Sequence, residues 1–241
     1  PETRELFSYR FTDGSFEGHS LGNIILSALE LRHGNFESAV AVASRVLRVR
    51  GEVLPVVLGD HKLVMTDGKK IIKGQYTVQG HHCRTRDVSV HLEPTPILNP
   101  KAAEAIKKAD IVVIAPGGFY YSILPILSVP GVKQALQRTR ATVVFFANLV
   151  NQDQSTHGWH VVDYVEAAEQ YIGKGTIDTV VYSTAPIPQA LLTKYVQSGD
   201  FPVSVAKERF SSRKDIQWLG EKLLSNKLPV CIAKSQKIPV R

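Results

Sequence analysis

Apolar residues recur at helical spacing near the start of the chain and then give way to short β-rich pieces. Leu21, Ile24 and Ile25 share one face of a helix expected within residues 14–36. A second helix is expected at 35–49, with Gly51 ending it. Three β-rich pieces follow, at 53–59, 62–65 and 70–78. Asp67-Gly68 is expected as a hairpin turn between the second and the third. These pieces predict a small β-meander beside a larger sheet.

Beyond residue 100 the pattern alternates between helical periodicity and continuous apolar runs. Helices are expected at 100–110, 121–136 (interrupted by Pro125 and Pro130), 161–172 and 189–199. Strands are expected at 111–115, 141–149, 177–183 and 201–206, and Cys231 is expected in the core of a last strand. Apolar strands that alternate with helices predict an α/β fold, Rossmann-like and doubly wound, with a mostly parallel sheet.

Two of the loops that follow these strands carry candidate binding residues. Ligands of such sheets bind outside the carboxyl ends of the strands, so the loops after residues 115, 149 and 183 are the ones to inspect. In the first loop, Pro116, Gly117 and Gly118 remove side chains where backbone N–H groups can approach a phosphate, and Ser122 adds a hydroxyl. The same three residues also form a common turn, so the motif alone does not decide between phosphate binding and a turn.

The loop after residue 149 is rich in amide side chains. Asn148, Asn151 and Gln152 stand near Asp153 at the end of a strand, and Asp163 lies in the first turn of the next helix. Amides in this place suit a ligand with many hydroxyl or carbonyl groups, such as a sugar or a uracil-like base. The alternative is a polar loop in which Asp163 only complements the helix dipole, and the sequence leaves both readings open.

The polar face of the first helix carries no charge. His19, Ser20, Asn23 and Ser27 make up this face, with glycines among them. A helix face turned towards water normally carries Lys and Glu, so an uncharged face of this kind indicates another function.

The composition is that of an ordinary soluble globule. The chain has 241 residues, 44% of them hydrophobic, and a net charge of +7. The basic excess lies in residues 201–241, where nine Lys or Arg stand against three acidic residues. Aromatic residues are not interleaved with these basic residues, and no nucleic-acid motif accompanies them. We therefore expect neither nucleic acid nor membrane as a partner. The absence of a leader, of long apolar runs and of a disulfide framework predicts a cytoplasmic location.

Residues 80–83, Gly-His-His-Cys, raise the question of a metal site. His81, His82 and Cys83 would alternate between the two faces of a strand, and no second pair of ligands stands at a recognised spacing. We expect a surface or strand-end role for these side chains and no metal.

Four segments resemble motifs of the CofD-like superfamily, and within it the gluconeogenesis factor (YvcK-type) branch. They are "GHSLGN" (18–23), "GEVLPVVL" (51–58), "ADIVVIAPGGFYYSILPIL" (109–127) and "FFANLVNQDQSTHGWHVVDYVEA" (145–167). The resemblance implies one domain over residues 1–241 that binds a nucleotide diphospho-conjugate. The family usually opens with a Gly-rich strand–turn, and this segment is not found before Pro1.

The resemblance also implies which residues contact the ligand. Gly18 and Gly22 would permit close approach, while His19 and Asn23 would contact diphosphate or sugar. The remaining expected contacts are Pro116, Gly117, Gly118, Tyr121, Ser122, Asn148 and Gln152. The chain departs from the family at 116–122, where relatives have Pro-Gly-Ser-Leu-Tyr-Thr-Ser, and at 152–156, where they have Gln-Pro-Gly-Glu-Thr.

Three functions follow as hypotheses. The first is a regulator of carbon metabolism and the cell envelope that binds a nucleotide sugar, a UDP-sugar rather than a GDP-conjugate, without a required cofactor. The second is a CofD-like transferase that moves a phospho-acyl group with Mg²⁺, with Asp153 or Asp163 as metal ligand or base. The third is a non-catalytic scaffold. Homo-oligomerisation stays open.

Overall fold

The computed structural model describes residues 2–83, 87–152 and 154–224. By internal contacts the described residues divide into two compact units, one before and one after the boundary between residues 59 and 60. The expectation of a single domain over 1–241 stays a prediction. The strand expected around Cys231 lies outside the described residues.

The described part of the first unit contains three α-helices, α1 (Glu2–Ser8), α2 (Leu21–His33) and α3 (Phe36–Val46), and the 3-10 helix η1 (Gly14–Phe16). Side-chain caps set where α2 and α3 begin. The Ser20 hydroxyl accepts a hydrogen bond from the backbone N–H of Asn23 at 3.2 Å, and the Asn35 side chain accepts one from Ser38 at 2.8 Å. The first expected helix is therefore confirmed but begins later than residue 14, and the second ends before Gly51.

The second unit begins with a small antiparallel sheet. Its strands are β1 (Lys62–Asp67), β2 (Lys70–Lys73) and β3 (Val88–Glu93), in the order β2-β1-β3. The β1–β2 hairpin confirms the turn at Asp67-Gly68. Residues 53–59 form no strand, and the end of the third expected piece is a short helix, α4 (Gln75–Gln79), because Gly74 turns the backbone with φ 97°.

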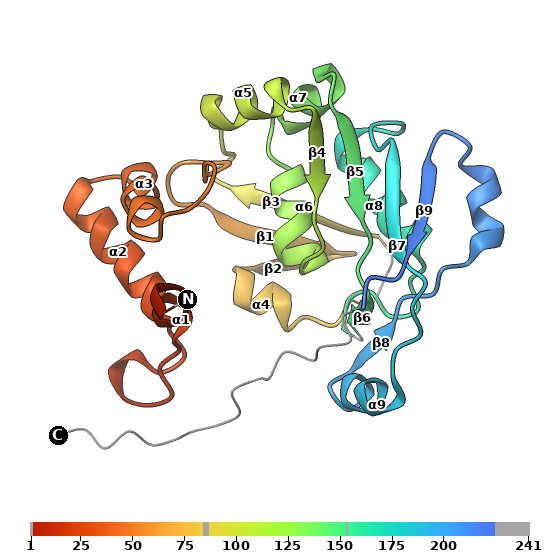
Figure 1. The fold of residues 1–241 in the computed structure, drawn as a ribbon, viewed down its shortest axis with the longest axis horizontal. Helices are drawn as coiled ribbons and strands as arrows, with labels where there is room; N and C mark the ends of the chain where they lie inside the picture. The colour runs from red at the N-terminus through yellow and green to blue at the C-terminus, as the bar shows by residue number, and fades with distance from the viewer. Residues whose placement is uncertain (1, 84–86, 153, 225–241) are drawn as a thin grey trace. The chain divides into compact units, whose positions relative to one another are not determined.

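The main sheet is parallel and has four strands in the described residues. They are β4 (Ile111–Ile114), β5 (Thr142–Phe146), β7 (Thr179–Ser183) and β9 (Gln217–Glu221), in the order β4-β5-β7-β9. Figure 1 shows β4, β5 and β7 pointing the same way. The segment 201–206, expected as the fourth strand, is not part of this sheet. The strand there is Asp200–Pro202 (β8), which pairs with β6 (Val150–Gln152) in antiparallel fashion, and Ser204 forms an isolated bridge with His160.

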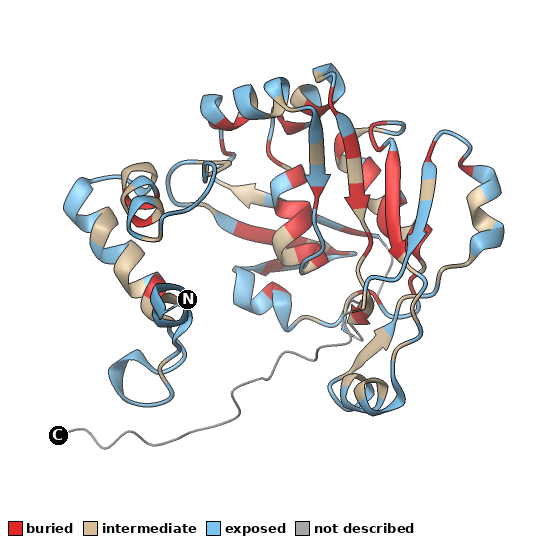
Figure 2. Cartoon of the chain, in the orientation of Figure 1, coloured by how far each residue is buried: buried red, intermediate tan, exposed pale blue. Residues whose placement is uncertain are grey.

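The helical segments of this part of the chain lie beside the parallel sheet, except for α9 (Gln189–Gln197), which packs on β8. They are α5 (Pro100–Lys108), the π-helix η2 (Phe119–Ile123), α6 (Leu124–Leu127), α7 (Val132–Arg138), α8 (Val161–Ile172), α9 and the 3-10 helix η3 (Lys207–Ser212). α8 carries the most buried face, and Figure 2 shows that β7 is buried along its length, whereas β4 is largely exposed. The α/β prediction is therefore confirmed.

Both ends of α8 are tied to the rest of the second unit by aromatic or charged side chains. Near its start, Tyr164 packs edge-to-face on Phe119 and Trp159, with ring centroids 4.9 and 5.1 Å apart. Near its end, Glu169 forms an ion pair with Arg213 at 2.8 Å, with only 5% of each side chain exposed. Arg213 also binds Asp215 at 2.8 Å, so the segment before β9 is fixed to α8.

Candidate ligand site at the carboxyl edge of the sheet

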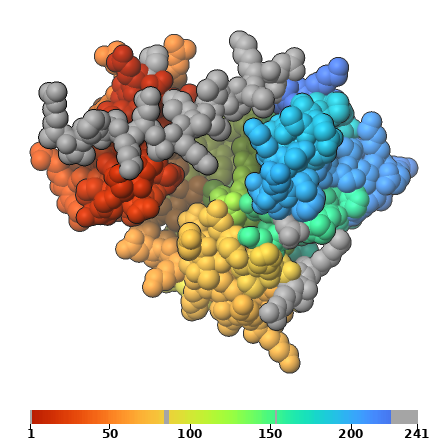
Figure 3. All heavy atoms as spheres, turned by 90° about the horizontal axis from the view of Figure 1, so that it is seen from below, coloured from red at the N-terminus to blue at the C-terminus, as the bar shows by residue number. Residues whose placement is uncertain are grey.

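The carboxyl ends of the parallel strands point towards the viewer of Figure 3. In that view the green surface of the middle of the chain is recessed between the yellow surface near residues 65–80 and the blue surface near α9. The loops after β4, β5 and β7 meet at this edge, as the parallel topology requires.

The loop after β4 leads into η2 without a side-chain cap. Gly118 is the N-cap residue, and no side chain accepts a hydrogen bond from the first turn. The carbonyl of Gly118 accepts two hydrogen bonds, from Ser122 N–H at 2.7 Å and from Ile123 N–H at 3.1 Å. The N–H groups at the start of this turn are thus not satisfied by a capping side chain, in contrast to those of α2 and α3.

Two amide side chains join this glycine loop to the loop after β5. Asn148 Nδ2 donates to the carbonyl oxygen of Gly117 at 2.9 Å. Gln152 Nε2 donates to the hydroxyl of Tyr121 at 3.1 Å. Among the described residues, the buried Asn148 Oδ1 has no hydrogen-bond partner. The structure therefore brings together five of the predicted positions: Gly117, Gly118, Tyr121, Asn148 and Gln152.

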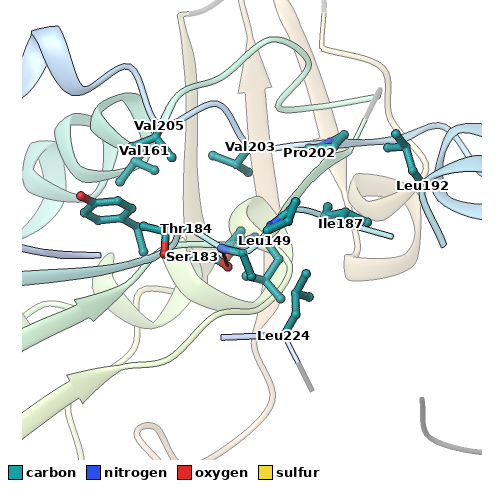
Figure 4. Close-up of a pocket in the computed structure, with 14 residues that line it drawn as sticks. Leu149, Val161, Ser183, Thr184, Ile187, Leu192, Pro202, Val203, Val205 and Leu224 are labelled. Atoms are coloured by element: carbon teal, nitrogen blue, oxygen red, sulfur yellow. Dashed lines mark hydrogen bonds between the residues drawn. The ribbon is translucent and has the colours of Figure 1, made fainter. Parts of the chain in front are cut away.

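A cavity of about 330 Å³ opens beside Asn148, between the ends of β5 and β7. Figure 4 shows side chains from the strand ends, from α9 and from the β8 segment converging on it. Ser183 and Thr184 are polar, whereas most of the wall is apolar: Leu149, Val161, Ile187, Leu192, Pro202, Val203, Val205 and Leu224. The strand-end rule pointed to the loop after residue 183 but singled out none of these wall residues.

Pro116, Gly117 and Ser122 also border a second cavity, of about 390 Å³. Its other walls are apolar and come from β4, α6 and α7, including Val113, Ile126 and Leu136. The glycine loop therefore borders this second cavity directly, whereas Asn148, which bonds to Gly117, borders the first.

Asp163 has its carboxylate engaged within the fold. One oxygen accepts the backbone N–H of His160 at 2.7 Å, which closes a capping box at the start of α8, and the other accepts from Arg209 at 2.9 Å. Burial by itself would raise the pKa of Asp163, but the bonds from His160 and Arg209 outweigh it and lower the pKa. A role of Asp163 as metal ligand or base stays a prediction. Asp153 lies outside the described residues.

The candidates in residues 18–23 belong to the first unit. His19 and Asn23 are exposed, and Gly18 adopts φ +81°, which favours glycine. Gly22 has a packing role, because a Cβ there would lie 2.7 Å from the carbonyl oxygen of Phe7. A shared pocket of these residues with the glycine loop stays a prediction.

Comparison with known proteins identifies the family. The family model described as 2-phospho-L-lactate transferase CofD matches residues 1–224. The chain belongs to the CofD family. It is 35% identical to the gluconeogenesis factor of Bacillus subtilis over 206 residues, which cover 84% of this chain and 64% of that protein. It is 33% identical to the gluconeogenesis factor of Listeria monocytogenes, over 91% of this chain and 66% of that one.

A solved structure shares the fold of this CofD-family chain. A Bacillus halodurans protein of the UPF0052 family superposes with a TM-score of 0.83 at 31% identity, covering 92% of this chain and 72% of that one. The chain spans slightly less than two thirds of the length of the curated relatives named above.

Of the three side chains expected on the surface or at a strand end, His82 is exposed, whereas His81 and Cys83 are partly buried. These residues follow α4, and the His81 side chain is 8% exposed, with Nε2 3.0 Å from a carboxylate oxygen of the buried Asp67. Burial, and then the charge of Asp67, raise the pKa of Cys83 to about 11, so its thiol stays protonated at neutral pH. Within the described ranges, no cluster of His, Cys, Asp and Glu has the geometry of a metal site.

The helices that the structure describes include none long and apolar enough to cross a membrane.

Proposed function

We propose that this CofD-family chain binds a nucleotide diphospho-conjugate, a UDP-sugar, at the carboxyl edge of the parallel sheet, and acts as a regulatory binding protein of gluconeogenesis factor type. The observation that carries the proposal is the pair of amide bridges, Asn148 to Gly117 and Gln152 to Tyr121. They hold a glycine loop without a capping side chain against a loop rich in amides.

The chemistry of these groups supports a ligand that has an anionic part and a neutral, hydroxyl-rich part. Uncapped N–H groups near Gly118 favour the anion, and the amides of Asn148 and Gln152 can both donate and accept. None of the described residues that line the cavity beside Asn148 is acidic. A place in carbon metabolism and cell-envelope control is part of the same proposal and is supported by the gluconeogenesis factors among the relatives.

A Mg²⁺-dependent phospho-group transferase is the second candidate. It is supported by the family model, whose description is that of a transferase. The cavity of about 330 Å³ beside Asn148 adds room for a second substrate next to the glycine loop.

Thermal unfolding with UDP-N-acetylglucosamine, with Mg²⁺ and in EDTA, separates the two candidates. For a binding protein, the ligand at a hundredfold excess over Kd stabilises the fold by about 2.7 kcal/mol in EDTA as well, and is recovered intact after long incubation. For a transferase, binding or consumption of the conjugate requires Mg²⁺.

A variant at the proposed site completes this test. Asn148→Ala is expected to weaken binding, whereas Gln79→Ala, a change of an exposed amide in α4, leaves it unchanged. The absence of stabilisation by any nucleotide conjugate would contradict both candidates.

A further inference from the structure

The side chain of Tyr121 lies directly on Gly118. A Cβ built on Gly118 would be 2.1 Å from both Cε2 and Cζ of the tyrosine ring, closer than two non-bonded carbon atoms can approach. Gly117 has no such neighbour, because the nearest atoms to its Cβ position are 3.6 Å away. Gly118 is therefore a glycine so that the ring of Tyr121 can cover it.

The ring is held at its far end as well. The Tyr121 hydroxyl accepts a hydrogen bond from Gln152 Nε2 at 3.1 Å. Gln152 is itself fixed, because it pairs with Asp200 in the β6–β8 ladder and its backbone N–H donates to the Thr156 hydroxyl at 3.0 Å. Two loops thus fix the position of one aromatic ring before any ligand binds.

Tyr121 differs in this from the aromatic residues beside it. Phe119 and Tyr120 are 2% and 4% exposed and pack in the core, where Phe119 contacts Tyr164. Tyr121 is only half-buried and lies at the carboxyl edge, where the amides of Asn148 and Gln152 also lie. A fixed, partly exposed aromatic ring beside hydrogen-bonding amides is typical of a surface on which a planar heterocycle stacks.

We infer that the nucleobase of the bound conjugate stacks on Tyr121 and that the amide of Gln152 reads the edge of this base. Beyond the donor used for Tyr121, the Gln152 amide carries a second N–H and a carbonyl oxygen, and these match the acceptor and donor on one edge of a uracil-like ring. Tyr121 is then a specificity-determining residue of the site. This inference rests on the proposed function.

Variants of Tyr121 test the inference by titration calorimetry with UDP and with UDP-N-acetylglucosamine. Tyr121→Phe keeps the aromatic face and is expected to bind both ligands within about threefold of the unchanged chain. Tyr121→Leu keeps bulk over Gly118 but loses the aromatic face, and roughly tenfold weaker binding of both ligands is expected, since stacking on a base is worth about 1–3 kcal/mol. Tyr76→Thr, at a tyrosine that is 90% exposed in α4, is the control and leaves affinity unchanged.

Each contrary result has its own meaning. Equal affinity of Tyr121→Leu and the unchanged chain would show that the ring only fills space, and would overturn the inference but not the proposed function. Weaker binding of UDP-N-acetylglucosamine with unchanged binding of UDP would assign the ring to the sugar and also overturn it. If neither ligand binds the unchanged chain, the proposed function fails and the inference fails with it.

Discussion

Two helical segments begin near the carboxyl edge of the sheet, and they begin in opposite ways. At the start of α8, the carboxylate of Asp163 accepts the backbone N–H of His160 and a hydrogen bond from Arg209, while the Asp163 N–H donates to the carbonyl oxygen of His160. η2 starts at Gly118 with no side-chain cap, and the loop before it is held from outside by neutral amides. The two helix starts therefore differ in what accepts hydrogen bonds from their N–H groups. At α8 the acceptors belong to the fold, whereas at η2 the N–H groups are left to solvent or to a ligand.

The surroundings of α8 and of the glycine loop also differ in the charge of their side chains. The ionised groups around α8 pair with one another, at Asp163 with Arg209 and at Glu169 with Arg213. The side chains that bridge the glycine loop carry no charge. Substitutions of the charged groups around α8 and of the neutral amides at the glycine loop test this difference.

The largest effect is expected from Glu169→Ala. Removal of this carboxylate leaves the buried guanidinium of Arg213 with Asp215 alone and also removes the acceptor for Gly175 N–H at 2.9 Å. Breaking a buried ion pair costs about 3–5 kcal/mol, which denaturant unfolding measures directly. Glu166→Ala is the matched control. The Glu166 side chain is 51% exposed and its ion pair with Arg209 is longer, at 3.4 Å, so a loss of under about 1 kcal/mol is expected. Similar losses for both variants would contradict the assignment of Glu169 as an anchor.

A smaller effect is expected from Asp163→Asn, which weakens the capping box and removes the ion pair with Arg209. The loss of unfolding free energy should be about 1–2 kcal/mol at neutral pH. Because the folded-state pKa of Asp163 is lowered, the stability it contributes is present above the pKa of the unfolded chain, near 3.9, and is lost as pH falls through the folded value. The two unfolding curves should therefore converge below about pH 4, and a constant difference down to acid pH would show that ionisation is irrelevant.

The smallest effect on stability is expected from Asn148→Ala. The change removes one hydrogen bond to Gly117, but it also removes a buried oxygen that lacks a partner in the described structure. These terms oppose each other, so the net loss should stay below about 1 kcal/mol by thermal unfolding, while ligand affinity falls. A large loss of stability would indicate that Asn148 serves the fold rather than the ligand.

The sequence was sufficient for the parts of the fold with strong periodicity. Residues 161–172 form α8 as expected, and the apolar runs before the loops at 115, 149 and 183 are parallel strands. The sequence did not predict β9, because Gln217–Glu221 contains no apolar run. Four of its five residues are exposed in the structure, so an apolar run is not required there. Propensity favoured a strand at 70–78, yet Gly74 starts a helix within it.

The sequence predicted which loops lie side by side at the sheet edge, but not which residues line the cavity there, and the ligand contacts stay a prediction. Parallel strands bring their carboxyl ends together, so Gly117 and Asn148 could be placed side by side from the order of elements alone. The cavity wall could not be placed, because Leu192 comes from α9 and Val203 follows β8, which pairs with β6 in antiparallel fashion outside the parallel sheet. The engagement of Asp163 with Arg209, 46 residues away, left no signal in the sequence.

One tryptophan lies near each end of α8, so tryptophan fluorescence can report on both ends of this helix. Trp159 is 8% exposed within the aromatic cluster around Tyr164, and Trp218 stacks on Phe210 and donates its indole N–H to the carbonyl of Arg213 at 3.3 Å. With only two tryptophans in the sequence, replacing one by Phe leaves the fluorescence of the other alone. Emission from Trp159 then follows the start of the helix beside the site, and emission from Trp218 follows the anchor at its end, so local opening of one end can be timed separately from global unfolding.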